Sequence, residues 1–171
     1  MTIARMAALS LVAASCVACS VDPTVSASSF ATEHSKDANS IVVAVDSVQT
    51  AVGIASDDQS LNAGSLVSLD SVLSDAQSTF VGVNNALLGA PKPDGMEDSA
   101  TEMWSATNEL NDSMKSLRSY LDDERPTDMT DFRKHWDRGR AWWNQAVTPI
   151  WKAAGQTPPV IADAPTAPPP S

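Results

Sequence analysis

The sequence predicts an all-α protein in which four long helices form an antiparallel, up-down-up-down bundle. Two observations support this prediction. Apolar and small side chains recur at spacings of three and four in four successive segments of the 171-residue chain, which puts each set on one face of a helix. The breaks between these segments are short, so consecutive helices are expected to lie antiparallel. Alternation of apolar and polar residues, which is typical of strands, is absent over any comparable length of sequence.

The four helical stripes follow one another along the middle of the chain. They cover residues 30–55, 66–87, 96–121 and 132–154, and the last is the least regular. Prolines in the breaks cannot continue a helix interior, and polar residues beside them suit N-cap positions. These prolines are Pro91, Pro93 and Pro126, and the N-cap candidates are Ser60, Asp94 and Thr127.

The fourth stripe contains two residues that shape its helix. Gly139 lies on the core line, where the missing side chain favours a close approach of a neighbouring helix. Pro149 removes a backbone donor and clashes with the preceding turn, so the helix is expected to kink or end there.

The chain divides into four parts. We expect a signal peptide at residues 1–18, a short polar tether at 19–28, the bundle at 29–156, and a tail at 157–171. The tail is rich in proline and lacks a hydrophobic period, so we expect it to be extended and disordered.

The N-terminus has the layout of a secretory signal. Arg5 precedes an apolar run at residues 6–14, which is followed by small residues. The run is far shorter than the roughly 18–20 residues of a membrane-spanning helix, so export without a transmembrane helix is expected.

Both cysteines, Cys16 and Cys19, lie directly after this run in the stretch "ASCVACS". Their C-x-x-C spacing also occurs in redox and metal sites, but no second ligand pair or βαβ pattern accompanies it. The stretch resembles the lipobox of bacterial lipoproteins, with Ala18 before Cys19 and Ser20 after it. The resemblance departs from the family at the third upstream position, where Cys16 stands in place of the usual leucine. Cys16 is the alternative site, preceded by Ser15.

The resemblance implies cleavage by signal peptidase II and acylation of Cys19, or of Cys16. The protein would then be a lipoprotein on the extracytoplasmic face of the cell membrane, and a soluble secreted protein is the alternative. The composition of the rest of the chain is similar to that of small envelope lipoproteins of actinobacteria.

The net charge of −10 argues against nucleic-acid binding, which needs clustered Lys and Arg. It also argues against a polybasic attachment to anionic lipids. Charge is unevenly distributed, because residues 21–91 hold eight acids and one base whereas residues 131–154 hold five bases and two acids. A basic fourth helix is therefore expected beside an acidic first one.

Four of the five tryptophans lie between residues 136 and 151. Trp136 and Trp143 fall on the core line, whereas Trp142 and Trp151 fall near opposite edges of it. Two interpretations remain open. All four side chains bury area in a core of small residues, or Trp142 or Trp151 stays partly exposed as a partner or carbohydrate contact.

His34 lies on the first apolar stripe, one turn before Asp37. In the antiparallel register it faces the neighbourhood of Trp104 and Trp151, so we expect a buried histidine that is hydrogen-bonded to a neighbour. A metal site is not expected, because the Glu-x-x-His pairs of di-metal bundles are missing. The second histidine, His135, is expected at the surface.

We expect no enzymatic activity and no cofactor, because neither a nucleophile elbow nor a phosphate-binding glycine loop is present. The predicted function is binding or scaffolding at the cell envelope, with an envelope protein as the partner. The alternatives are a ligand- or metal-binding envelope module that uses the His34 and Trp151 end, and a lipoprotein of the phage-exclusion type.

Overall fold

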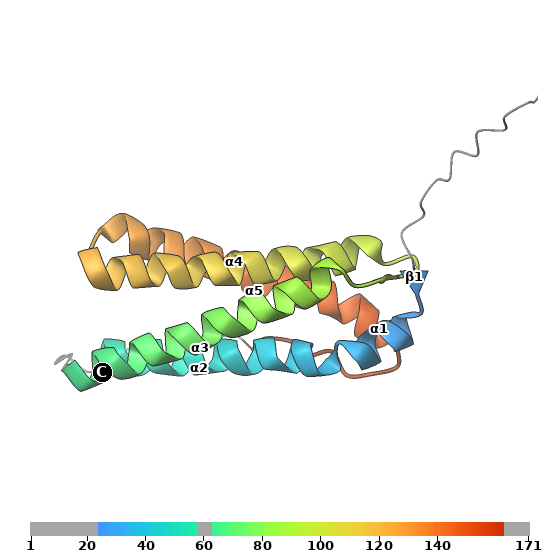
Figure 1. The fold of residues 1–171 in the computed structure, drawn as a ribbon, viewed down its shortest axis with the longest axis horizontal. Coiled ribbons are helices and arrows are strands. Elements are labelled where there is room, and N and C mark those ends of the chain that lie inside the picture. The colour runs from blue at the N-terminus through green and yellow to red at the C-terminus, as the bar shows by residue number, and fades with distance from the viewer. Residues whose placement is uncertain (1–23, 58–62, 163–171) are drawn as a thin grey trace, which may run out of the picture.

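The computed structural model describes residues 24–57 and 63–162, and this part of the chain is predominantly helical (Figure 1). The all-α prediction is therefore confirmed. Its elements are β1 (Thr24–Val25), α1 (Ala27–Glu33), α2 (Ser35–Asp57), α3 (Ala63–Leu88), β2 (Lys92–Pro93), α4 (Glu97–Asp123) and α5 (Pro126–Ala153). The predicted signal peptide, Cys16, Cys19 and Ser60 lie outside the described residues.

The first predicted helix is divided into α1 and α2 at His34. Ser26 caps α1 by accepting a hydrogen bond of 3.1 Å from the backbone N–H of Ser29. At the other end, His34 leaves the helical conformation with φ −94° and ψ 7° while its N–H donates to the Phe30 carbonyl at 2.9 Å. The break changes the direction of the chain without interrupting its apolar stripe.

Residues 24–28, predicted as the end of a tether, belong to the fold. β1 pairs in parallel with β2, placing Thr24 opposite Lys92 and Val25 opposite Pro93. The Asp94 N–H donates to the Val25 carbonyl at 2.9 Å. The polar composition of the segment gives no sign of this pairing, because it depends on backbone groups and on the distant connection between α3 and α4.

Extensive helix packing among the described residues joins α2 with α3, α3 with α4, and α4 with α5, and α1 also packs against α5. The buried residues form one cluster along these contacts. The largest fully buried side chains are Trp143, Phe30, Phe80, Ile41, Leu73, Met103, Leu110, Met114 and Ile150. As expected, Gly139 allows a close approach, because a Cβ added there would meet Leu110 of α4.

α5 does not end at Pro149 but continues to Ala153. Pro149 is exposed, so the ring occupies the outer face of the helix rather than the packed one. Of the two outcomes expected at this residue, a kink or an end of the helix, the end does not occur, because a single missing donor near the C-terminal end leaves the packing of α5 intact.

Gly155 reverses the chain after α5. Its φ of +70° is favourable for glycine, and its N–H donates to the Lys152 carbonyl while the Gln156 N–H donates to that of Trp151. These two bonds form a Schellman motif. The chain then returns along α5, and Ile161 is buried with 3% exposure. Residues 157–162 are therefore structured, whereas a disordered tail was predicted from residue 157 onward. They are held in place because side chains of α5 form hydrogen bonds with their backbone. Residues 163–171 lie outside the described part.

None of the described helices is both long enough and apolar enough to cross a membrane.

Candidate functional site

The tryptophans of α5 differ sharply in exposure. Trp136 and Trp143 are buried on the core side, as predicted. Trp151 is also buried, with 2% exposure, which removes it as a surface contact. Trp142 is 36% exposed, and the Arg138 guanidinium lies 5.5 Å from the centre of its ring. Trp142 is thus the tryptophan of the predicted pair that a partner could reach.

His34 is buried, with 5% exposure, as predicted. Its ring lies 4.5 Å from that of Phe30, and Phe30 makes an edge contact with Trp151 at 6.5 Å. The expected hydrogen bond is not formed. Neither ring nitrogen of His34 has a hydrogen-bond partner among the described residues. The nearest acidic oxygen belongs to Asp37, at 3.6 Å from His34 Nδ1.

A small cavity of about 130 Å³ lies beside this aromatic cluster. Trp104 lines it together with Phe30, and the indole Nε1 of Trp104 is buried without a hydrogen-bond partner. The remaining lining residues are Leu87, Leu88, Ala90, Lys92, Ala100 and Thr101. Three of the four predicted binding residues, His34, Trp104 and Trp151, therefore gather around Phe30 at one end of the molecule.

The described residues contain no group of three His, Cys, Asp or Glu side chains placed to hold a metal ion.

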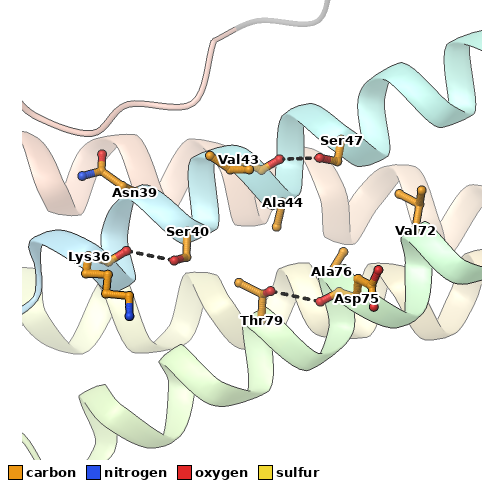
Figure 2. Close-up of a pocket in the computed structure, with 10 residues that line it drawn as sticks. All are labelled: Lys36, Asn39, Ser40, Val43, Ala44, Ser47, Val72, Asp75, Ala76 and Thr79. Carbon is orange, nitrogen blue, oxygen red and sulfur yellow. Dashed lines mark hydrogen bonds between the residues drawn. The ribbon is translucent and has the colours of Figure 1, made fainter.

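A hollow with a volume of about 570 Å³ lies between α2 and α3 (Figure 2). We call it the α2–α3 groove. α2 contributes Lys36, Asn39, Ser40, Val43, Ala44 and Ser47, and α3 contributes Val72, Asp75, Ala76 and Thr79.

The groove is more apolar than its residue types suggest. Its three hydroxyls donate to carbonyls of the preceding turn: Ser40 to Lys36 at 2.9 Å, Ser47 to Val43 at 2.8 Å, and Thr79 to Asp75 at 3.0 Å (Figure 2). Each hydroxyl hydrogen is thus already used. The small side chains of Ala44 and Ala76 are buried, whereas Val43 is 65% exposed. The groove therefore offers a largely apolar surface with one lysine, one asparagine and one aspartate among its lining residues.

Sequence reasoning missed this groove, although a signal for it exists. Residues 41–45 read Ile-Val-Val-Ala-Val. On a helix this run covers more of the circumference than the single face that a helix buries against one neighbour. Ile41, Val45 and Val48 fill the core side, and Val43 is left pointing away from it.

Two side chains of α5, those of His135 and Arg138, pair with an acid of α4. Glu109 of α4 lies 2.6 Å from His135 Nδ1 and 3.1 Å from Arg138 Nη1. His135 is accordingly half-buried, where a surface position was expected. Arg118 of α4 reaches Asp70 of α3 at 3.3 Å. The pairs at Glu109 join α5 to α4, whereas the expected neighbour of the basic helix was the acidic first helix.

No protein-family model matches the sequence, and no curated protein or solved structure is significantly similar to it.

Proposed function

We propose that this chain is a lipid-anchored, extracytoplasmic helical protein that acts without catalysis, by binding a partner protein at the cell envelope. The α2–α3 groove is the proposed binding surface. The observation that carries this proposal is the exposure of Val43, at 65%, in this groove of about 570 Å³. Concave sites lined by apolar side chains are the places where proteins preferentially bind ligands.

The partner segment that suits this groove is an amphipathic helix. Two helices with small residues between them form a channel in which a third helix can approach closely, and hydroxyls that are already bonded to carbonyls demand no new partners. Lys36 and Asp75 supply one charge of each sign, so the partner is expected to carry an acid and a base beside its apolar face.

The proposed anchor is the acylated Cys19, with Cys16 as the alternative. Thr24 lies five positions after Cys19, and this length of chain spans at most about 18 Å. The end of the fold that carries β1 and β2 would then lie next to the membrane. Because the net charge is −10, electrostatic attraction to anionic lipids would contribute little. The acyl chains would therefore carry the attachment to the membrane.

We further propose that α2, α3, α4 and α5 form an up-down-up-down four-helix bundle. The packing of each consecutive pair supports this arrangement, and α1 links the first long helix to α5. Among the described helices, α1 rather than α2 packs against α5, so the bundle would be closed through α1. Spin-label distances between α1 and α5, and between α3 and α5, test this arrangement.

Val43→Glu tests the groove as a contact surface. Val81→Glu is the matched control, because Val81 is also an exposed valine (42%) but does not line the groove. With a photo-cross-linking residue placed at Ser47 in cells, we expect a discrete cross-linked product that Val43→Glu abolishes and Val81→Glu preserves. Equal amounts of cross-linked product from the wild type and from both variants would contradict the groove as a contact surface.

Mass spectrometry of the mature N-terminus tests the anchor separately. We expect a diacylglyceryl-modified cysteine at position 19, and release of the Cys19→Ser protein into the medium. An unmodified terminus after Ser20 would contradict anchoring while leaving the groove untouched.

The cavity beside Trp104 supports a second candidate, binding of a small apolar ligand that carries one hydrogen-bond acceptor. Its apolar walls and the unpartnered Trp104 Nε1 favour such a ligand. Indole-fluorescence titration with small aromatic ketones tests it, with Ala100→Phe as the variant that fills the cavity.

A further inference from the structure

Residues 157–162 contact α5 in the way that a bound peptide contacts its receptor. They leave α5 through Gly155, return along it, and have no helix or strand of their own. We call residues 157–162 the strap, and the surface of Arg140, Trp143 and Asn144 that holds it the strap site.

The strap site binds the backbone of the strap. Trp143 Nε1 donates to the Pro159 carbonyl at 2.9 Å. The Asn144 side chain pairs with both backbone groups of Ile161, donating to its carbonyl at 2.9 Å and accepting from its N–H at 2.7 Å. Arg140 Nη2 donates to the Ala162 carbonyl at 2.7 Å. Four hydrogen bonds therefore hold the backbone of three strap residues, which are Pro159, Ile161 and Ala162.

Side-chain recognition is concentrated in one residue. Ile161 is 3% exposed, whereas its neighbour Val160 is 48% exposed. Pro159 occupies the middle of a three-residue turn, in which the Val160 N–H donates to the Pro158 carbonyl at 2.9 Å. Proline suits this position because its φ is fixed and it has no N–H to satisfy. The strap thus presents to this site a proline followed two residues later by a buried, branched apolar residue.

We propose that the strap site is a receptor for an extended peptide with a Pro-x-Ile pattern, and that the strap is an intramolecular ligand which such a peptide from a partner protein displaces. This inference goes beyond the proposed function, because it concerns a different surface from the α2–α3 groove and does not depend on the anchor. Backbone-directed hydrogen bonds make the site tolerant of the other residues of the peptide.

The strap is attached in a way that permits release. Gly155 lies at a positive φ and is exposed, so it can serve as a hinge. Between this hinge and Pro159, Gln156 makes a long side-chain contact of 3.4 Å from its Nε2 to Thr32 Oγ1. A short flexible connection gives the strap an effective concentration on the order of millimolar, so a competing peptide must bind more tightly or be held nearby.

Two full-length variants separate strap release from general damage. Ile161→Asp puts a charge on the buried residue and should free the strap site, whereas Val160→Asp puts the same charge on the exposed neighbour. Circular dichroism and thermal melting establish that both proteins are folded. The probe is a fluorescently labelled, end-capped peptide with the sequence of residues 156–162, QTPPVIA, and the control peptide has Asp in place of Ile.

We expect the probe to bind Ile161→Asp at least about tenfold more tightly than it binds the wild type or Val160→Asp, because its own strap no longer competes. Adding Asn144→Ala to Ile161→Asp should weaken binding by at least about tenfold, since two hydrogen bonds are lost. Equal affinity for all variants, or no binding to Ile161→Asp, overturns the proposal.

Wild-type protein provides a readout that does not depend on the folding of Ile161→Asp. Excess QTPPVIA should increase hydrogen exchange of the Ile161 amide of the protein, because the displaced strap loses its bond to Asn144. Unchanged exchange at saturating peptide contradicts displacement. A concentration-dependent dimer that requires Asn144 would show that the strap of a second copy fills the site, and would overturn its assignment to a different partner.

Discussion

Gly139 of α5 lies against Leu110 of α4 so closely that a Cβ at Gly139 would stand 2.9 Å from Leu110 Cγ and 3.1 Å from its backbone nitrogen. The leucine side chain could turn away, but the backbone nitrogen cannot move without separating the helices. We expect Gly139→Ala to lower the free energy of unfolding by about 1–3 kcal/mol, measured by urea denaturation.

Gly82→Ala is the matched control for this prediction. Gly82 also lies inside a long helix, but nothing stands within 4 Å of an added Cβ. Alanine should therefore raise the free energy of unfolding by about 0.5–1 kcal/mol through helix propensity. A Gly139→Ala protein as stable as Gly82→Ala would mean that α4 and α5 are not in close contact at this point.

Thr107 links α3 to α4 through a buried hydroxyl. Its Oγ1 accepts from Asn84 Nδ2 at 2.9 Å and donates to the Trp104 carbonyl at 2.7 Å. Thr107→Val should cost about 1–2 kcal/mol, because the Asn84 donor loses a partner in a partly buried place. Thr101→Val, at an exposed hydroxyl on the same helix, should change the free energy of unfolding by less than about 0.5 kcal/mol. Comparable losses in both variants would argue against the bridge.

Glu124 ends α4 in the left-handed region, at φ 53° and ψ 26°. This conformation costs a residue with a Cβ about 1–2 kcal/mol, and glycine avoids that cost. Glycine loses more chain entropy on folding, so the net gain expected for Glu124→Gly is about 0.5–1 kcal/mol. Thermal melting measures it. Glu102→Gly, inside the same helix, is the control and should destabilise the protein. A lower melting temperature for Glu124→Gly would contradict the backbone strain inferred at Glu124.

Glu97, in the first turn of α4, has a pKa below its ordinary value of 4.5, mainly because its own backbone N–H and that of Gly95 bond to the carboxylate. A lowered pKa in the folded state stabilises the protein above the ordinary value, and this contribution is lost as the pH falls through the lower, folded-state value.

A carbon NMR titration of the Glu97 carboxyl should accordingly give a midpoint below 4.5. The difference in unfolding free energy between the wild type and Glu97→Gln should shrink as the pH is lowered through that midpoint. A difference that stays constant with pH would refute the role of the charge.

Helical spacing alone predicts most of the core. Phe30, Phe80, Trp136 and Trp143 all lie on the expected stripes and are buried, because burying an apolar face drives helix packing. Spacing does not reveal the break at His34, since both α1 and α2 continue the same stripe. Nor does it reveal the strap, whose contacts are hydrogen bonds between backbone groups and the side chains of Trp143 and Asn144.

The candidate surfaces were harder to predict than the core. Trp151 and Trp142 look equivalent in a helical projection, yet only Trp151 is covered, in part by Phe30. That difference depends on where α1 crosses α5, which is a tertiary property. The α2–α3 groove depends in the same way on the separation of two helices, and a residue pattern along one helix does not contain it.

The pairing of β1 with β2 also has a mechanical consequence. Any pull on the chain ahead of Thr24 reaches the short ribbon before it reaches a helix, so the bond from Asp94 to Val25 and its neighbours carry the load first. Because β2 lies between α3 and α4, that load passes into the middle of the helical body as well as into α1. A force applied on the N-terminal side is thereby shared between two points of the fold, and α1 is protected from unfolding from its N-terminal end.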